Sequence, residues 1–391
     1  MTKKVAAAGD RFIGEGAFAV LAKARALEGK GKSIIHLEIG EPDFDTPRNI
    51  KDAAADYLLN KGFTHYTASA GLMDTRVAVA EYISRTRGVP VEPSQVVVTP
   101  GAKPAIFAGI VGLVEAGDEV IIPLPAYPSY ESLTRYAGGT PVFVPLLEER
   151  NFVMDTDHLV SLISPRSKLI VLNSPQNPTG GVLGHDDLKA ISEAAVKYDV
   201  YVLADEIYSR ILYEGKHESI LQFPGMAERT ILIDGFSKTY AMTGWRLGYG
   251  VYPKHLVDRA VLIVNNMVSC ATAFVQMAGI DALRGPQGEV DKMVAEFKRR
   301  RDIIVDGLNS IPGVTCKRPR GAFYVFPNVK SFKRSSDELA DLMMNEAGVA
   351  LLSGAAFGRQ GEGYLRLSYA NSVENIQKAV ARMKGALAKL H

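Results

Sequence analysis

Cysteine is scarce in this sequence: it has only Cys270 and Cys316, which lie 46 residues apart and form no CxxC pair. This spacing provides neither a disulfide framework nor a zinc motif, so we expect no metal site and a reducing compartment, with the cytoplasm as the default. No uninterrupted apolar run reaches the ~18 residues of a membrane span. The start, MTKKVAAAGDRF, lacks the apolar core of a secretory signal. We therefore expect no membrane partner.

An excess of charge of either sign is also lacking, since 45 basic and 43 acidic residues leave a net charge of +2. Proteins that bind nucleic acid usually carry a clear basic excess, so nucleic acid is not an expected partner. The most basic run, Lys298–Arg301, falls in a stretch with apolar residues at three- and four-residue steps, which predicts the solvated face of a helix. The 391 residues are enough for two domains, or for one large α/β domain with a smaller companion. A composition of 47% hydrophobic and 23% charged residues is typical of a soluble globular protein with a full core.

Short apolar runs alternate with amphipathic stretches between about Pro47 and Tyr252. Because the runs are apolar throughout, they predict parallel strands that helices cover on both faces. The expected strands are QVVVT, EVIIP, KLIVLN, VYVLAD, TILIDG and WRLGYGV, at 95–99, 119–123, 168–173, 200–205, 230–235 and 245–251. Residues 286–310 predict one long helix. After it, AFYVFP, a helix over Asp337–Ala347, VALLS and YLRLSYA predict a smaller α+β unit, completed by residues before Pro47.

One lysine, Lys238, lies in the apolar stretch DGFSKTYAMTGWRLGYG, where the nearest other charges are Asp234 and Arg246. Taken alone, such a lysine is most simply a surface residue whose aliphatic stem packs on apolar neighbours. The alternative is a desolvated amine with a lowered pKa, which is nucleophilic toward carbonyl groups.

Other polar residues follow predicted strands at the end where open parallel sheets bind ligands. Gly101, Ala102 and Lys103 turn a strand into a helix and could hold a phosphate with their backbone N–H groups, although ordinary turns look alike. Asn177 in NSPQNPTG could face inward or only stabilise its turn. Asp205 ends an apolar strand, where it could cap the next segment or pair with a protonated nitrogen. Together, a nucleophilic lysine, a phosphate cradle and a buried aspartate describe a pyridoxal phosphate site.

The sequence resembles the class I/II aminotransferases, which are fold-type I pyridoxal-phosphate enzymes. The motifs NSPQNPTG, DEIY, SKTYAMTGWRLGY and RLSYA occur in the family's order and approximate spacing, and the likeness extends from LEIGEPDFDTP near residue 37 to YLRLSYA near residue 364. This resemblance implies an α/β fold with a mostly parallel seven-stranded sheet between helices. The expected regions are an N-terminal arm and part of the small domain (1–46), a large cofactor-binding domain (47–285), and an interdomain helix with the small domain (286–391).

The resemblance also implies roles for individual residues. Lys238 would bond to the cofactor and later move the Cα proton, Asp205 would pair with the ring nitrogen, and Asn177 and Tyr208 would contact the ring's 3′ oxygen. Tyr127 would stack on the ring. The residues expected to hold the phosphate are Gly101, Ala102, Lys103, Ser237 and Arg246, together with Tyr66 from the other subunit of a homodimer. Many relatives have a serine where this chain has Gly235, so Ser237 would supply that hydroxyl.

For the substrate, Arg366 resembles the arginine that binds the α-carboxylate as a bidentate fork, with Gly40 and Asn177 beside it. Its neighbours in YLRLSYA are apolar, where an unpaired guanidinium would be costly. Residues 261–283 contain no Lys, Arg or His to hold a second carboxylate. We therefore expect neutral aliphatic or aromatic donors, although Lys103 could supply a charge. The residues expected to flank the donor's side chain are Phe18, Ile39, Ala355 and Ala356.

The expected function is transamination, in which the amino group of an L-α-amino acid passes to a 2-oxo acid by a ping-pong cycle. A lyase, a decarboxylase, an oxidase and an aspartate-type aminotransferase remain open alternatives on the same fold. A transcriptional regulator that borrows this fold would need a DNA-binding domain, and the 36 residues before Leu37 disfavour it.

Overall fold

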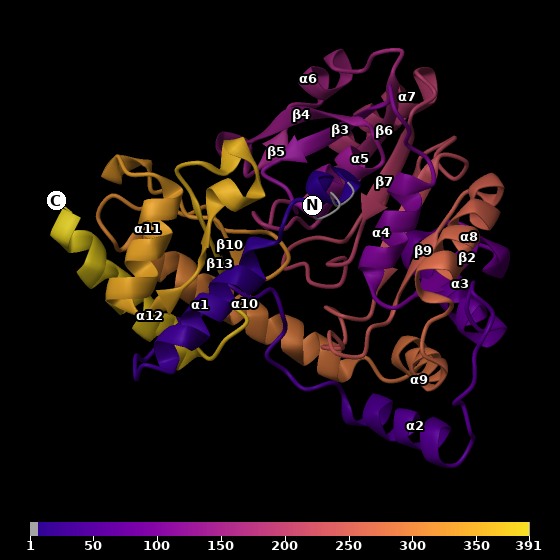
Figure 1. Cartoon of the computed structure of the whole chain (residues 1–391), viewed down its shortest axis with the longest axis horizontal. Coiled ribbons are helices and arrows are strands. Elements are labelled where there is room, and N and C mark those ends of the chain that lie inside the picture. The colour runs from indigo at the N-terminus through magenta and orange to yellow at the C-terminus, as the bar shows by residue number, and fades with distance from the viewer. Residues whose placement is uncertain (1–6, 391) are drawn as a thin grey trace, which may run out of the picture.

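The computed structural model describes residues 7–390, which form a larger and a smaller region joined by the long helix α10 (Gly288–Asn309) (Figure 1). At its start α10 packs into the larger region, where Val290 joins the core around the sheet. Further along, Phe297 and Leu308 belong to the core of the smaller region. The predicted helix over 286–310 is thus confirmed, and it ties the two cores together. The predicted domain limits at 46/47 and 285/286 stay predictions.

The larger region is built on an eight-stranded sheet in the order β2-β9-β8-β7-β6-β3-β4-β5. Its strands are β2 (Val96–Thr99), β3 (Glu119–Leu124), β4 (Thr140–Leu147), β5 (Val153–Met154), β6 (Ser167–Asn173), β7 (Tyr201–Asp205), β8 (Thr230–Gly235) and β9 (Gly248–Val251). The five strands from β4 to β8 are parallel, while β9 and β5 run antiparallel to their neighbours. This confirms the mostly parallel sheet, with one strand more than the seven expected.

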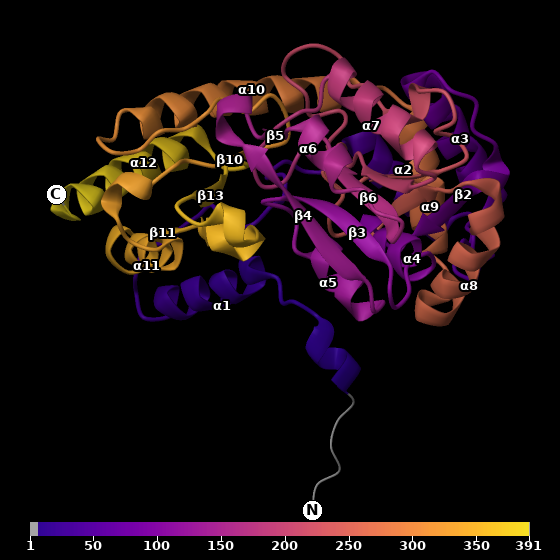
Figure 2. The ribbon, with the colours of Figure 1, turned by 90° about the horizontal axis from the view of Figure 1, so that it is seen from above.

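Helices cover both faces of the sheet, as the continuous apolar runs predict (Figure 2). Alternate residues along β3 show this: Val120 and Ile122 join one core and Ile121 joins the other. One face is covered by α4 (Ala102–Val111), α5 (Ser129–Tyr136) and α8 (Val257–Val268). The other is covered by α3 (Met73–Arg87), α6 (Thr156–Ser161), α7 (His185–Lys197) and α9 (Ala273–Arg284), with α2 (Arg48–Leu59) packed against α9.

The smaller region combines short strands with α1 (Gly16–Glu28), α11 (Ser336–Leu342) and α12 (Val373–Leu387). Strands β10 (Tyr324–Val325), β13 (Leu365–Ser368) and β12 (Leu352–Ser353) form an antiparallel sheet. Strand β1 (Ile35–His36) pairs in parallel with β11 (Val349–Ala350), which attaches residues before Pro47 to this region. The helix expected over Asp337–Ala347 is α11 followed by a π-helical turn at Met343–Ala347.

One predicted strand begins later than expected. The run WRLGYGV was predicted to be extended from Trp245, but β9 starts at Gly248 because Arg246 adopts a left-handed conformation with φ of 53°. Trp245 and Arg246 therefore belong to the loop that connects β8 with β9. Within residues 7–390, no helix has the length and apolar character needed to cross a membrane.

Candidate active site

The predicted site residues lie at the carboxyl ends of neighbouring strands. Gly101 follows β2, Asp205 ends β7, and Lys238 follows β8. These strands run in the same direction because β9, which separates β2 from β8, is antiparallel to both. Residues far apart in the sequence therefore meet at one edge of the sheet, where open α/β sheets bind ligands.

Lys238 is partly buried, and its Nζ donates a hydrogen bond to the carbonyl oxygen of Gly40 at 2.5 Å. It also lies over the ring of Phe323, 5.9 Å from the ring centre. Burial lowers the pKa of Lys238 to about 8, because a charged ammonium loses its water here. About a tenth of the amine is therefore uncharged at pH 7, far more than for an ordinary lysine, and the uncharged form is the one that acts as nucleophile or base.

Asp205 is buried, and both of its carboxylate oxygens accept hydrogen bonds. Tyr130 donates to Oδ2 at 2.6 Å, and the backbone N–H of Ile207 donates to Oδ1 at 3.2 Å. Burial raises the pKa of Asp205 to about 6, although these two hydrogen bonds oppose the rise. A carboxylate this deprived of water would be stabilised by a cationic nitrogen placed against it.

Arg366 has free hydrogen-bonding capacity although it is buried. Its Nη2 donates to the carbonyl of Glu38 at 2.8 Å, while Nε and Nη1 have no partner. The guanidinium stacks over Tyr324, 4.7 Å from the ring centre. Since a buried unpaired donor is costly, the free N–H groups of this planar guanidinium are suited to binding a carboxylate.

Tyr324 also joins Arg366 to the rest of the site. Its hydroxyl lies 2.7 Å from that of Tyr208, whose pKa burial raises well above its usual value. At Gly40, a β-carbon would lie 2.2 Å from the Tyr324 hydroxyl, so a side chain there would collide with it. Glycine is required because the segment passes directly over the tyrosine.

The turn between β2 and α4 has the shape of a phosphate cradle. Gly101 has φ of 89° and precedes α4, whose first backbone N–H groups have no partner within the helix. A β-carbon on Gly101 would lie 2.5 Å from Nη2 of Arg246, and one on Gly248 would lie 2.5 Å from the nitrogen of Ala102. Arg246 thus packs directly against the cradle, where it would reinforce the attraction for an anion.

Two further residues face this region. The side-chain oxygen of Asn177 is buried without a partner, while its backbone N–H donates to Asn173 Oδ1 at 2.9 Å. The ring of Tyr127 meets that of Tyr130 edge to face at 5.7 Å. The unpaired Asn177 oxygen, the glycine-lined cradle and the desolvated lysine and aspartate fit a bound pyridoxal phosphate.

Other predicted residues are less closely associated with the site. Ser237 is buried beside Lys238, and Ile39 is half-buried beside Gly40. Phe18 is 65% exposed on α1, so its place beside a substrate stays a prediction. Tyr66 is 91% exposed, so within a single chain it does not enter the site.

Three contacting residues were not identified from the sequence. Tyr130 follows Tyr127 by three residues in PAYPSY, a spacing that could have indicated a shared site, and its backbone N–H donates to the carbonyl of Tyr127 at 3.2 Å. Tyr324 was taken only as part of a strand. Glu15, whose Oε1 pairs with Lys103, gave no signal because it is separated from Lys103 by 88 residues.

The fold and the site geometry together define a pyridoxal-phosphate-dependent enzyme of fold type I. The family model for aminotransferase class I and II matches residues 32–383, and the chain belongs to this family. It is 43% identical to an aspartate aminotransferase of Pyrococcus horikoshii, over 92% of this chain and 92% of that protein. It is 41% identical to aromatic-amino-acid aminotransferase 2 of Thermococcus litoralis, over 93% of both chains. The solved aspartate aminotransferase of Thermus thermophilus with maleate superimposes with a TM-score of 0.94 at 36% identity, over 98% of this chain and all of that one.

Proposed function

We propose that this pyridoxal-phosphate-dependent aminotransferase takes its amino group from a neutral L-amino acid, with the residues above in the roles that the family resemblance implies. The observation that carries the proposal is the segment 38–40. Its Gly40 carbonyl binds Lys238, and its Glu38 carbonyl binds Arg366. A carboxylate held by Arg366 would therefore place the rest of an α-amino acid beside the Lys238 amine.

Each residue then has a defined task. When bound, pyridoxal phosphate would supply an electron sink and a carrier for the amino group. Lys238, with its lowered pKa, accepts a proton from the donor's Cα and returns it. Asp205 holds a proton on the cofactor's ring nitrogen, and Arg366 orients the α-carboxylate. The phosphate is held by the Gly101 turn and by Arg246.

The preference for neutral donors is supported by the environment of Lys103. Its ammonium pairs with Glu15 Oε1, which also accepts hydrogen bonds from Tyr127 at 2.6 Å and Ser129 at 3.3 Å. Burial alone would raise the pKa of Glu15, but the bonds from Lys103 and Tyr127 more than offset it and lower the pKa. Glu15 is therefore ionised at neutral pH and neutralises the cation that an acidic donor would need.

Single-turnover half-reactions test this preference. The holoenzyme is mixed with alanine, leucine, phenylalanine, aspartate or glutamate, and conversion of the cofactor to its amino form is followed by absorbance. We expect neutral donors to react with the highest efficiency. Glu15→Gln should raise the efficiency with aspartate relative to phenylalanine by about tenfold, or ~1.4 kcal/mol.

The matched control is Glu131→Gln on α5, which removes a glutamate that pairs with the exposed Arg135. A roughly tenfold preference of the unaltered enzyme for aspartate would contradict neutral-donor specificity. Release of ammonia and pyruvate from β-substituted amino acids, in place of stoichiometric conversion, would instead indicate a lyase.

We also infer a homodimer whose active sites are shared. Tyr66 and Met267 are 91% and 39% exposed, and their segments adjoin because Asn265 donates to Ser69 at 2.7 Å. Exposed apolar side chains gathered in this way are typical of an interface. We place the enzyme in the cytoplasm, which is supported by both cysteines being free thiols.

A further inference from the structure

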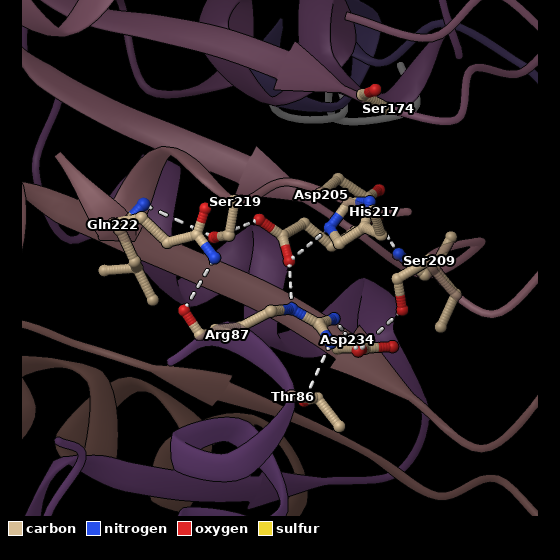
Figure 3. Close-up of polar contacts among 12 residues, drawn as sticks. Thr86, Arg87, Ser174, Asp205, Ser209, His217, Ser219, Gln222 and Asp234 are labelled. Carbon is tan, nitrogen blue, oxygen red and sulfur yellow. Dashed lines mark hydrogen bonds and ion pairs between the residues drawn. The ribbon is translucent and has the colours of Figure 1, made fainter. Parts of the chain in front are cut away.

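A buried ion cluster is formed by Arg87, Glu206, Asp234 and His217 (Figure 3). The Arg87 side chain is only 2% exposed. Its Nε donates to Glu206 Oε2 at 2.7 Å, and its Nη2 donates to Asp234 Oδ2 at 2.9 Å. One rigid, planar group therefore holds two carboxylates from different strand ends.

Each carboxylate lies at a strand end close in sequence to a proposed catalytic residue. Glu206 directly follows Asp205 at the end of β7, and Asp234 lies in β8 four residues before Lys238. Asp234 Oδ1 accepts a hydrogen bond from the backbone of Gly235 at 2.7 Å, so its side chain also fixes the start of the lysine loop. Arg87 is thus linked to both strand ends by direct contacts.

Further hydrogen bonds hold Glu206 and the backbone of Arg87 in place. His217 Nε2 lies 2.9 Å from Glu206 Oε2, and Ser219 donates to Oε1 at 2.6 Å. Burial alone would raise the pKa of Glu206, but the charges of His217 and Arg87 more than offset it and lower the pKa to about 2. Gln222 holds the carbonyl of Arg87 at 2.9 Å. Arg87 is therefore held both at its backbone carbonyl and at its guanidinium.

Such a cluster is an expensive way to stabilise a core. Removing charged groups from water costs several kcal/mol for each ion, and well-packed apolar residues often stabilise a protein as much or more. Arg87 ends α3, and the cluster spans the gap between this helix and the ends of β7 and β8. Its directional hydrogen bonds fix the distance between the segments that follow β7 and β8. Apolar packing, which is not directional, would fix that distance less precisely.

We propose that Arg87 is a positioning residue that fixes Asp205 and Lys238 relative to one another through Glu206 and Asp234. This inference rests on the proposed roles of Asp205 and Lys238. If the Arg87 guanidinium no longer binds both Glu206 and Asp234, the segments that carry Asp205 and Lys238 can move apart. Asp205 would then be less well aligned with the ring nitrogen. A ring nitrogen that keeps its proton less firmly carries less positive charge, so the pKa of the adjoining Lys238–cofactor chromophore should rise.

The test compares Arg87→Lys with Arg301→Lys. Arg301 is also 2% exposed and also binds two carboxylates, Glu214 and Asp302, but neither lies at either of these strand ends. For Arg87→Lys we expect the chromophore's pKa, measured by absorbance against pH, to rise by about half a unit or more. We expect kcat to fall by about tenfold or more. In the cofactor-free protein, hydrogen exchange should increase in peptides covering 205–210 and 234–240.

If Arg87→Lys does not fold, the triple variant Arg87→Met, Glu206→Gln, Asp234→Asn replaces it, since it removes the guanidinium together with both of its carboxylate partners. It should fold and still show the three changes. A loss of thermal stability like that of Arg301→Lys, with chromophore pKa, exchange and kcat unchanged, would show a purely structural role and overturn the inference. If the unaltered holoenzyme shows no chromophore that titrates with pH, the proposed role of Lys238 fails instead.

Discussion

The fold of the cofactor-free protein disfavours the ionised form of Asp205. Burial raises its pKa from an ordinary value of 3.8 to about 6, so the folded protein binds the proton more tightly than the unfolded chain does. Its contribution to stability is therefore largest below pH ~4 and declines as the pH rises through 6. Above that pH the ionised carboxylate destabilises the fold by about 3 kcal/mol. Such a penalty is expected for a carboxylate that we propose pairs with the cofactor's ring nitrogen.

We therefore predict that Asp205→Asn stabilises the cofactor-free protein while it impairs catalysis. An amide fills the same space, and the Tyr130 hydroxyl can reverse to satisfy it. Urea titration should show a gain of about 3 kcal/mol above pH 7 and about half of that at pH 5. The control is Asp199→Asn, an exposed carboxylate paired with Arg229, which should change stability little. A variant less stable than the parent at pH 7 would contradict the assignment.

The residues that the sequence identified are those whose chemistry conflicts with their surroundings. Lys238 and Arg366 are cations in apolar segments, and the structure shows both with donors directed into the site. Tyr130 and Tyr324 escaped notice because a tyrosine in an apolar segment needs no explanation. Their importance comes from hydroxyl contacts with Asp205 and Tyr208, which only the folded chain brings within reach.

At the scale of elements, the turn from β2 into α4 requires a residue without a side chain at Gly101. Gly101 needs its positive φ, and any β-carbon there would meet the guanidinium of Arg246 at 2.5 Å. Both demands act on the same backbone N–H groups that are proposed to hold the phosphate. A small change at this glycine should therefore affect cofactor binding more than folding.

The prediction is that Gly101→Ala weakens pyridoxal phosphate binding by about tenfold or more, because the strained turn and the displaced arginine both disturb the cradle. Equilibrium titration of the cofactor-free variant measures the dissociation constant, and its melting temperature reports the cost to the fold. Gly385→Ala in α12 is the control, since an added β-carbon there meets no atom within 4 Å. Equal affinities for the Gly101 variant and the parent would show that this turn is not the phosphate site.

Elements buried on both faces were predicted well, and irregular ones were not. The limits of β3, β6, β7 and β8 agree with their apolar runs to within one residue. Strand β4 was not singled out because it is only partly buried and contains Pro141 and Pro145, which weaken a strand pattern. The π-helical turn after α11 was read as continuous helix, because the periodicity of a single turn cannot separate the two.

At the scale of the whole molecule, the unexplained feature is Tyr66. It is 91% exposed although the family resemblance assigns it to a phosphate, and the segment that follows it is anchored by the bond from Thr67 to Cys270 at 3.5 Å. An exposed tyrosine, on a segment that adjoins that of the exposed Met267, is accounted for if a second copy of the chain covers it. The second copy would then receive Tyr66 at its own cradle.

Mixing an impaired subunit with an inactive one tests this arrangement. Tyr66→Phe should impair activity, since losing a hydrogen bond to a charged group costs about 1.5–3 kcal/mol, and Lys238→Ala should abolish it. If sites are shared, a mixed dimer joins Lys238 from one subunit to Tyr66 from the other, so one of its two sites is restored. Differently tagged subunits, refolded together and purified as heterodimers, should therefore regain activity.

The two controls separate a shared site from simpler explanations. Tyr198→Phe changes another exposed tyrosine, at the end of α7, and should leave activity unaltered. Mixing Lys238→Ala with Asp205→Ala should restore nothing, because both positions belong to the same subunit's site and each subunit would still lack one of them. Verified Tyr66→Phe and Lys238→Ala heterodimers that stay at the Tyr66→Phe level would show that each chain completes its own phosphate site. Tyr66 would then have to reach the Gly101 turn by a movement of residues 60–72 within one chain.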